Sequence, residues 1–237
     1  MKILFCWDDG SPHDIQLIRL HERYKIPGMF FIPTINKEGR PVITDSDIKR
    51  YCSKYISFGA HTNNHTYLTS IDKNNIEKEV IDNKKYLERI TGKEIKHFCL
   101  PGGKYNNKIL KIVKKHFKTI RTADTGCFHH KKTYLIKPTI HFYDRGYRSL
   151  FLNCMKHIEI KEAFYIWKHR KDNYFELLKR IIDFESNKKK DSIIIVWGHS
   201  WEIEEFSLWD KIEDLFLFVT DNYNLNIIEY DELCDFK

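Results

Sequence analysis

The sequence predicts an α/β fold with a parallel sheet, and three observations support this fold class. Short apolar runs alternate along the chain with longer segments whose apolar residues recur at helical spacing. The run Ser192–Trp197 includes three isoleucines and a valine, which is typical of a strand buried on both faces of a parallel sheet. Roughly seven or eight such strands are expected, and this number favours a closed or nearly closed (β/α) barrel over an open sheet.

Five short segments in the first half of the chain are predicted to be strands. Each contains apolar or β-branched residues and is followed by turn or polar residues. The five segments are Ile3–Trp7, Met29–Ile32, Tyr55–Phe58, His97–Leu100 and Thr119–Thr122.

The segments between these strands are predicted to be helices that bury one face. The clearest is Asp72–Thr91, where Ile76, Val80 and Leu87 lie on one side and Gly92 stands where a helix commonly ends. Pro27-Gly28 interrupts the first helical segment. The other helices are expected at Asp14–Tyr24, from Thr44 or Asp45 to Tyr51, and at Asn107–Phe117.

The second half of the chain begins with a stretch that lacks clear periodicity. Residues 123–157 are rich in Tyr, Phe, His and Arg, and we expect irregular structure with short strands near Tyr134–Ile136 and Thr139–Phe142. Regular patterns then return. Helices are expected at Glu162–Lys168, Asn173–Phe184 and Leu208–Val219, and strands at Ser192–Trp197 and Asn226–Ile228.

The composition indicates a folded protein without a nucleic-acid partner. The chain has 237 residues, of which 42% are hydrophobic, and a formal net charge of +7. No DNA- or RNA-binding signature accompanies the basic residues. We interpret them first as solvated surface and second as a means of attracting an anionic substrate. The basic clusters are Lys114–Lys115, His129–Lys132, Lys168–Lys171 and Lys188–Lys190.

The location expected from the sequence is the cytoplasm. The six cysteines stand singly without a C-x-x-C pair, which favours free thiols in a reducing compartment. The apolar stretch Ile3–Trp7 is shorter than the core of a signal peptide, and no apolar run approaches the roughly 20 residues of a membrane span. With no internal linker or repeat, residues 1–237 are expected to form one domain, and the sequence does not indicate its oligomeric state.

Chemically reactive or turn-forming residues follow four of the predicted strands. Each alone has an ordinary explanation, as a turn or a structural histidine. The carboxyl ends of the strands in a parallel barrel meet at one face, however, so these residues are expected to converge on one site. They are Asp8 and Asp9 after the first strand, His61 and His65 after the third, Pro101–Gly103 after the fourth, and His199 after the isoleucine-rich strand.

Their chemistry predicts metal-dependent hydrolysis. Two histidines four positions apart and one carboxylate suit a divalent metal ion and leave positions open for water and substrate. A second carboxylate beside the ligand can take a proton from water, and a separate histidine can donate one to a leaving group. These are the groups that hydrolysis of an unactivated amide requires.

The same residues resemble the motifs of the NodB-homology polysaccharide deacetylase family, carbohydrate esterase family 4. The strongest matches are Trp7-Asp8-Asp9-Gly10 and His61-Thr62-Asn63-Asn64-His65, and the resemblance runs from Phe5 to about Glu202. It implies a distorted (β/α) barrel with about seven parallel strands. It also implies a hydrolase that removes an N-acetyl or related N-acyl group from an amino sugar or glycan precursor.

The resemblance assigns a role to each motif. Asp8 would be the general base, the backbone N–H of Gly102 in the Cys99–Gly103 motif would help to hold the oxyanion, and His199 would be the general acid. The metal ion is expected to be Zn²⁺, with Co²⁺, Ni²⁺ or Mn²⁺ as alternatives. Its ligands would be Asp9, His61 and His65.

Two departures from the family pattern leave roles to be filled. Many members carry an arginine in the third motif that orients the base, but this chain has Cys99 there, so Arg121 or Arg145 would have to substitute. The aspartate that polarises the acid histidine is also not evident. The candidates for that role are Asp124 first, then Asp144 and Glu202.

The expected substrate follows from the family and from the expected location. A cytoplasmic member would act on a nucleotide-linked or lipid-linked acetamido sugar, whose faces Tyr105, Trp201 and the aromatic residues around Phe128 and Tyr143 could contact if they do not serve the core. The principal alternative is a metal-dependent amidohydrolase for a small non-sugar amide. An inactive glycan-binding protein is a further alternative, against which the intact Asp8 and His199 argue.

Overall fold

The structure, a computed structural model, describes residues 1–130, 134–188 and 192–234. Parts of two basic clusters, Lys131–Lys132 and Lys189–Lys190, lie outside the described residues. The strands are β1 (Lys2–Asp8), β2 (Gly28–Ile32), β3 (Ile56–Ala60), β4 (His97–Cys99), β5 (Thr119–Arg121), β6 (Leu135–Ile136), β7 (Ile140–His141) and β8 (Ile193–His199). The α-helices are α1 (Asp14–Tyr24), α2 (Asp45–Tyr51), α3 (Lys73–Thr91), α4 (Asn107–Val113), α5 (Gly146–Lys156), α6 (Ile160–Lys168), α7 (Tyr174–Ser186), α8 (Ser200–Glu205) and α9 (Trp209–Tyr223). Short 3₁₀ turns are η1 (Leu68–Ser70), η2 (Pro101–Gly103), η3 (Asn224–Asn226) and η4 (Tyr230–Cys234).

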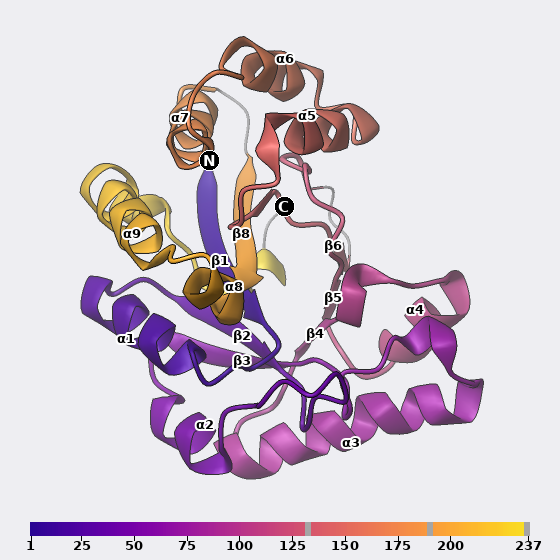
Figure 1. The fold of residues 1–237 in the computed structure, drawn as a ribbon. Helices are drawn as coiled ribbons and strands as arrows, with labels where there is room; N and C mark the ends of the chain where they lie inside the picture. Colours follow the sequence, from indigo (N-terminus) through magenta and orange to yellow (C-terminus); the bar gives the residue numbers. More distant parts are fainter. Residues whose placement is uncertain (131–133, 189–191, 235–237) are drawn as a thin grey trace.

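The eight described strands run parallel in one sheet with the order β6-β5-β4-β3-β2-β1-β8-β7 (Figure 1). The two edge strands, β6 and β7, are separated in the chain only by residues 137–139. Because a chain extends by at most about 3.6 Å per residue, the edges lie within roughly 15 Å of each other. The sheet is therefore curled into a nearly closed barrel. The predicted distorted barrel is confirmed, with eight strands instead of about seven.

Alternate residues along the strands serve two different cores. On β1, Leu4 and Cys6 belong to an inner cluster inside the curled sheet, whereas Ile3, Phe5 and Trp7 belong to the outer cluster beneath the helices. The C-terminal segment adds two side chains to the inner cluster, which also contains residues of β2, β4, β6 and β8. These additions are Ile228 and Tyr230.

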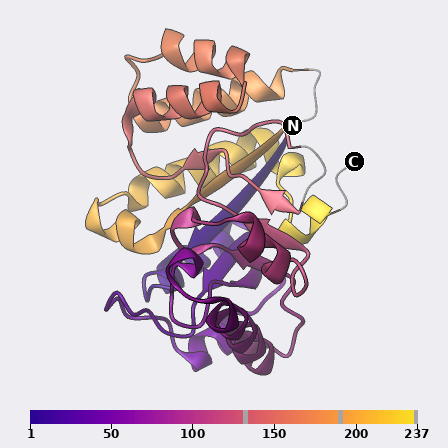
Figure 2. The same ribbon diagram turned by 90° about the vertical axis from the view of Figure 1, so that its right-hand side faces the viewer.

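Most of the predicted helices are confirmed, and local capping explains where two of them begin. Thr44 accepts a hydrogen bond from the backbone N–H of Asp47 and forms a capping box at the start of α2. Asp72 caps α3, which ends at Gly92, a residue with φ of 67° in the left-handed region. The helices lie outside the curled sheet, with α3 crossing beneath it in the views of Figures 1 and 2.

Three predictions about the second half of the chain were wrong. Helix α5 lies in the stretch expected to be irregular, because only two of its side chains, Leu150 and Cys154, are buried and no apolar period marks it. Helix α8 was also missed, since six residues are too few to show a period. The expected strand Asn226–Ile228 is instead a 3₁₀ turn followed by a single bridge from Ile227 to Ile3. Strand β2 pairs with β1 only from Phe5 onward, so only the short start of β1 remains free on that side, and Ile3 makes the bridge there.

A buried histidine connects β1 to the outer helices. The Trp7 indole N–H donates to Nε2 of His21 over 2.7 Å, and Nδ1 of His21 lies 3.0 Å from the carbonyl oxygen of Ile26. The imidazole is fully buried and packs edge-on against Phe5 and Phe216. Burial lowers the pKa of His21 to about 3, so the ring stays neutral in the fold.

The stability of the protein should therefore decrease as the pH falls below about 6. Between the ordinary pKa of His21 and its folded value of about 3, the unfolded chain binds a proton that the folded chain does not. This difference reduces the free energy of unfolding by about 1.4 kcal/mol per pH unit. His21→Asn should be less stable at pH 7 but show a shallower pH dependence in urea unfolding, whereas His13→Asn, at a partly exposed site, should keep the original slope. Equal slopes for all three proteins would contradict this assignment.

Candidate active site

The two aspartates at the end of β1 lie in different environments. Asp8 is the last residue of the strand and stands in register with His199 on β8. Asp9 has φ of 75°, which is unusual for a residue with a side chain, and Gly10 follows with φ of 62°. A Cβ on Gly10 would lie 2.9 Å from Ile32, so this turn requires glycine. The turn separates the two carboxylates, so that each contacts a different set of residues.

Asp9, His61 and His65 form a buried cluster of metal-binding atoms. The Nε2 atoms of His61 and His65 lie 3.3 and 3.0 Å from Oδ1 of Asp9. The three donor atoms lie within 4.8 Å of one another. Burial alone would raise the pKa of Asp9, but the three surrounding histidines, His199 among them, hold this pKa well below its usual range. Two imidazole nitrogens and one carboxylate oxygen fit a divalent ion such as Zn²⁺.

The outer nitrogens of the two histidines indicate which tautomers suit a metal ion. Nδ1 of His61 lies 2.9 Å from the carbonyl oxygen of Cys99, which can accept its proton and leave Nε2 free as a ligand. Nδ1 of His65 is buried without a hydrogen-bond partner, and the Glu38 carboxylate lies 3.6 Å from it. Both rings therefore direct Nε2 toward Asp9.

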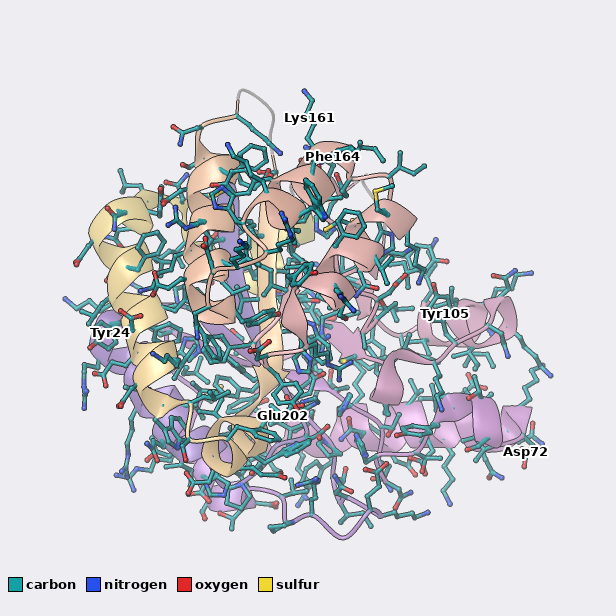
Figure 3. The ribbon with its side chains drawn as sticks, turned by 45° about the horizontal axis from the view of Figure 1, so that its top comes forward. Tyr24, Asp72, Tyr105, Lys161, Phe164 and Glu202 are labelled. Carbon is teal, nitrogen blue, oxygen red and sulfur yellow. The ribbon has the colours of Figure 1, made fainter. Side chains whose placement is uncertain are left out.

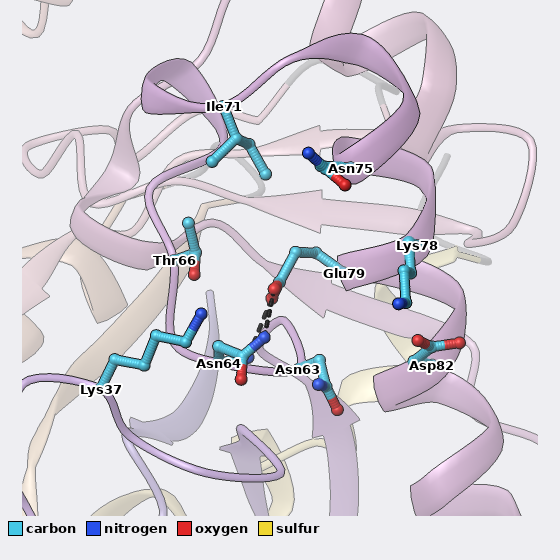
Figure 4. Close-up of a pocket in the computed structure, with 9 residues that line it drawn as sticks. All are labelled: Lys37, Asn63, Asn64, Thr66, Ile71, Asn75, Lys78, Glu79 and Asp82. Carbon is cyan, nitrogen blue, oxygen red and sulfur yellow. Dashed lines mark hydrogen bonds between the residues drawn. The ribbon is translucent and has the colours of Figure 1, made fainter.

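Helix α3 holds the loop that carries the two histidines. Asn83 is fully buried, and its Oδ1 accepts from the backbone N–H of His61 over 2.8 Å while its amide donates to the carbonyl of Ile32 over 3.1 Å. One turn earlier, the Glu79 carboxylate accepts from the backbone N–H of Asn64 over 2.9 Å. Figure 4 shows this contact in a pocket of about 340 Å³ between the loop and α3. The lining of this pocket does not include Asp9, His61 or His65.

The loop itself has a strained backbone. Thr62 and His65 have φ of 65° and 53°, and a β-branched residue such as Thr62 rarely adopts this conformation. Its hydroxyl accepts from the backbone N–H of Thr66 over 3.0 Å and closes the loop. The contacts with α3 hold this conformation, which brings His65 back over Asp9.

Asp8 forms a buried ion pair with Arg121 across the inside of the barrel. The guanidinium contacts both carboxylate oxygens of Asp8, lies 2.9 Å from the Cys99 sulfur and donates to the carbonyl of Thr122 over 3.0 Å. Burial opposes the charged form of Arg121, but the Asp8 carboxylate outweighs it and keeps the pKa of Arg121 above its usual range. The arginine missing at Cys99 thus has a counterpart on β5, the next strand.

His199 is paired with Glu202 and not with Asp124. Nδ1 of His199 lies 2.7 Å from Oε2 of Glu202, and the same oxygen lies 2.8 Å from Nε2 of His141. Burial opposes protonation of His199, but Asp9 and Glu202 outweigh it and raise its pKa to about 9. Burial likewise opposes ionisation of Glu202, yet the two histidines lower its pKa to about 2. Nε2 of His199 faces Asp9 at 3.8 Å, on the side of the metal-binding cluster.

Trp201 contacts both His199 and the cluster of Asp9, His61 and His65. Its indole N–H donates to Oδ2 of Asp9 over 3.0 Å, and its ring stacks on His199 with centroids 5.1 Å apart. The guanidinium of Arg40, on the loop before α2, lies 3.6 Å from the centre of the Trp201 ring. Trp201 thus lies beside Asp9 and His199, and its contact with a substrate stays a prediction.

The other residues predicted for the site lie at different distances from it. Gly102 borders the cluster, since a Cβ there would lie 3.0 Å from the Tyr67 ring, which in turn faces His65. Tyr105 packs against the outer core and lies toward α4, to the side of Glu202 (Figure 3). Phe128 is fully buried in the core and therefore does not contact substrate.

The alternative orienting residues are engaged elsewhere. The Asp124 carboxylate is bound by Lys156 at 2.6 Å and by Lys137 at 3.2 Å, so the expectation that it orients His199 is corrected in favour of Glu202. Asp144 accepts from the backbone N–H of Gly146 at the start of α5. The Arg145 guanidinium lies 6.0 Å from the centre of the Tyr143 ring. Of the two lysines that bind Asp124, Lys137 lies between β6 and β7, and Lys156 is the last residue of α5. The sequence pattern did not predict α5.

Sequence reasoning missed two residues that support the site. Asn83 interrupts the apolar face of α3 formed by Ile76, Val80 and Leu87, and a polar residue on that face is a signal that could have identified it. His141 follows a stretch without periodicity, and no sequence signal distinguishes it from the other histidines there.

Comparison with known proteins identifies the family. The model of the polysaccharide deacetylase family matches residues 1–119, half of the chain, and the chain belongs to this family. A curated relative, the peptidoglycan-N-acetylglucosamine deacetylase of Bacillus cereus, is 28% identical over 115 residues, which make up 48% of this chain and 52% of that protein. The chain thus spans about half the length of this relative.

Two solved structures share the fold over almost the whole chain. One is a peptidoglycan N-acetylglucosamine deacetylase in complex with a naphthyl-substituted N-oxidanyl-benzamide, with a TM-score of 0.60, 14% identity, and coverage of 100% of this chain and 89% of that one. The other is a family 4 acetyl xylan esterase from Clostridium thermocellum in complex with a cobalt ion, with a TM-score of 0.56, 12% identity, and coverage of 98% and 89%. At these identities the likeness supports the fold.

Removing both partners of the Asp8–Arg121 pair should destabilise the protein by less than the sum of the two single removals. Arg121→Met leaves a buried carboxylate without a counter-ion and should lower the free energy of unfolding by about 3–5 kcal/mol. Asp8→Asn combined with Arg121→Met should lose less than the sum of the single changes, because neither charge remains. Urea unfolding of the four proteins measures this coupling. The exposed Arg23–Glu213 pair, at 2.9 Å, serves as control and should show coupling of about 1 kcal/mol or less. Additive effects of the two substitutions would contradict the assignment of a buried ion pair between Asp8 and Arg121.

Asn83→Ala should weaken metal binding although Asn83 contacts no ligand atom. Without its side chain, the backbone N–H of His61 loses its acceptor and the strained loop loses its tie to α3. Supporting residues of this kind change metal affinity by about 10–100-fold, and titration calorimetry with Zn²⁺ measures the change. Asn74→Ala, at an exposed position of the same helix, should bind Zn²⁺ like the unmodified protein. Unchanged affinity in Asn83→Ala would show that the loop holds its shape without α3.

Proposed function

We propose that this chain is a metal-dependent carbohydrate N-deacetylase that removes an N-acetyl or related N-acyl group from an amino sugar or glycan precursor. The observation that carries the proposal is the convergence of a metal-binding cluster, an arginine-paired carboxylate and a carboxylate-paired histidine on one face of the barrel. Membership of the polysaccharide deacetylase family supports the reaction class.

Asp9, His61 and His65 would hold the metal ion. We propose Zn²⁺, and Co²⁺, Ni²⁺ or Mn²⁺ could occupy the same donor set. When bound, such an ion supplies Lewis acidity that polarises an amide carbonyl and lowers the pKa of a water molecule. The cobalt-bound relative is consistent with a metal site in this fold.

Asp8 is proposed as the general base. Arg121 and the Cys99 thiol, whose sulfur lies 3.5 Å from Oδ2 of Asp8, fix the orientation of the carboxylate beside the cluster. A carboxylate held in this position by the ion pair can accept a proton from the attacking water. The water oxygen then forms the new bond to the carbonyl carbon. The Gly102 backbone N–H, at the edge of the cluster, is proposed to donate to the resulting oxyanion.

His199 is proposed as the general acid. Glu202 holds its Nδ1, so the proton on Nε2 faces the cluster side where the leaving nitrogen would lie. Donation of this proton as the C–N bond breaks releases the amine without forming an unstable anion. One water is consumed, and the products are acetate and a free amino group.

The rim of the site favours a substrate with negative charge near the acetamido group. Arg40 lies over Trp201, which stacks on His199, and Lys104 lies 4.7 Å from the centre of the Tyr67 ring, which faces His65. Among the described residues, no carboxylate lies within ion-pair distance of either cation. A phosphate on a nucleotide-linked or lipid-linked amino sugar would neutralise them. This favours a glycan precursor over the alternative, a small neutral amide.

Acetate release tests the proposal directly. Metal-stripped protein with and without Zn²⁺ or Co²⁺ is incubated with a neutral N-acetylglucosamine oligosaccharide, a nucleotide-linked N-acetylamino sugar and a small non-sugar acetamide. We expect metal-dependent release, fastest from the anionic sugar. Asp8→Asn should lower turnover by about 100-fold or more while metal still binds, and His61→Ala should lose the metal as well.

The outcomes separate the alternatives. Release from the non-sugar acetamide alone would replace the sugar substrate with the small amide. Metal binding without release from any substrate would leave a metal-binding protein that does not catalyse the proposed reaction. Absence of metal binding in the unmodified protein would contradict the proposal as a whole. Lys108→Gln, at an exposed position on α4, serves as the matched surface control and should retain full activity.

A further inference from the structure

Exposed apolar side chains gather on one part of the surface. Six of the ten large hydrophobic side chains that are exposed in the described chain lie within residues 152–167, on α5, on α6 and in the turn between them. Soluble surfaces usually carry such side chains singly. The six, which we call the α5–α6 patch, are Leu152 (63% exposed), Met155 (40%), Ile158 (80%), Ile160 (40%), Phe164 (63%) and Trp167 (50%).

Helix α6 is apolar on two faces. Ala163 and Ile166 are buried in the core, whereas Ile160, Phe164 and Trp167 follow the spacing i, i+4, i+7 and form a stripe on the outer face. Figure 3 shows Phe164 and Lys161 at the outer side of α6, with Lys161 extending away from the body of the protein. The outer stripe is thus not required for the core.

The turn between the two helices presents an isoleucine in a strained conformation. Ile158 has φ of 62°, a left-handed conformation that β-branched residues rarely adopt, and it is the most exposed of the six. Backbone hydrogen bonds to the carbonyl oxygens of Met155 and Cys154 fix the turn around it. Glycine or asparagine would fit this turn without strain. A strained and exposed apolar residue indicates that the tip contacts something outside this chain.

The charge around the patch has one sign. Between residues 145 and 171 both acidic side chains are buried, Glu159 against His129 and Glu162 against Lys188. Arg170 stacks on Trp167, with its guanidinium 4.4 Å from the ring centre. Every exposed charged residue in this stretch is basic: Arg145, Arg148, Lys156 (which pairs with Asp124), Lys161, Lys168 and Lys171.

We propose that the α5–α6 patch docks on the surface of an anionic lipid bilayer. Trp, Phe and Ile side chains flanked by Lys and Arg are the composition of segments that lie in the membrane interface, where the apolar groups enter the headgroup boundary and the cations meet anionic lipids. A second copy of this chain would fit less well, because a symmetric contact would bring the two cationic patches together. No helix in the described part of the chain is long and apolar enough to cross a membrane, so the contact is interfacial.

The patch and the candidate active site lie at different ends of the barrel. Figures 1 and 2 place α5 and α6 near the start of β1, whereas α8, which follows the end of β8, lies toward the opposite end. Substitutions in the patch therefore leave the metal-binding cluster untouched. This inference does not rest on the proposed deacetylase activity.

Vesicle flotation with the whole chain tests the proposal. Vesicles of phosphatidylcholine alone are compared with vesicles that also contain about one third phosphatidylglycerol. We expect binding to the anionic vesicles and a loss of about tenfold or more in the bound-to-free ratio for Phe164→Ser/Trp167→Ser and for Lys161→Glu/Lys168→Glu. The control for the apolar change is Leu217→Ser/Leu225→Ser, at residues that are 44% and 91% exposed and lie outside the patch. The control for the charge change is Lys108→Glu/Lys111→Glu on α4. The urea midpoint of each variant verifies folding.

Three results would overturn the proposal. The first is absence of the unmodified protein from anionic vesicles. The second is an equal loss in the Lys108→Glu/Lys111→Glu control, which would show attraction by net charge alone. The third is a dimer in sedimentation equilibrium that Phe164→Ser/Trp167→Ser converts to a monomer without any vesicle binding, which would make the patch a subunit interface.

Discussion

The buried ion pair between Asp8 and Arg121 connects the chemistry of the site to the shape of the barrel. Strands β1 and β5 are separated by three other strands in the sheet, so their side chains can meet only because the sheet curls and both face its interior. Neither charge would be stable there alone, since burial of an unpaired ion is strongly unfavourable. The pair therefore requires the curl.

The metal-binding cluster depends on a second constraint, the shape of the loop after β3. Its residues Thr62 and His65 adopt left-handed conformations that cost free energy, and Asn83 and Glu79 on α3 supply the hydrogen bonds that hold them. His61 and His65, the proposed metal ligands on this loop, are thus positioned by α3, a helix that contributes no proposed ligand. In the same way, Glu202 on α8 positions His199 without facing the metal-binding side.

The two functional surfaces that we propose place different demands on the fold. The candidate active site lies where strand ends and loops converge. The α5–α6 patch is formed by two helices that cover another part of the barrel. These helices carry apolar side chains that are not buried in the core. A barrel with separate ends can bind a surface with one and a soluble or lipid-linked sugar with the other, without a shared residue.

Some features could not be predicted because their signals are weak along the chain. Helix α5 buries only Leu150 and Cys154, so its apolar residues do not follow the period on which helix prediction depends. Asp124 has the residue type expected for orienting His199, but its partners Lys137 and Lys156 become neighbours only after β7 and α5 have folded. The single bridge at Ile227 depends on how much of β1 its neighbours leave free.

The sequence by itself determined the parallel α/β barrel and the convergence of Asp8, Asp9, His61, His65 and His199, because apolar periodicity and short-range spacing are local properties of the chain. Only the tertiary structure decided which residues support them. Asp8 pairs with Arg121 on β5, because the third motif has no arginine. His199 pairs with Glu202 and not with Asp124. The physical reason is that these are contacts between charged groups across a curled sheet and its loops, and such contacts follow distance in space and not order in the chain.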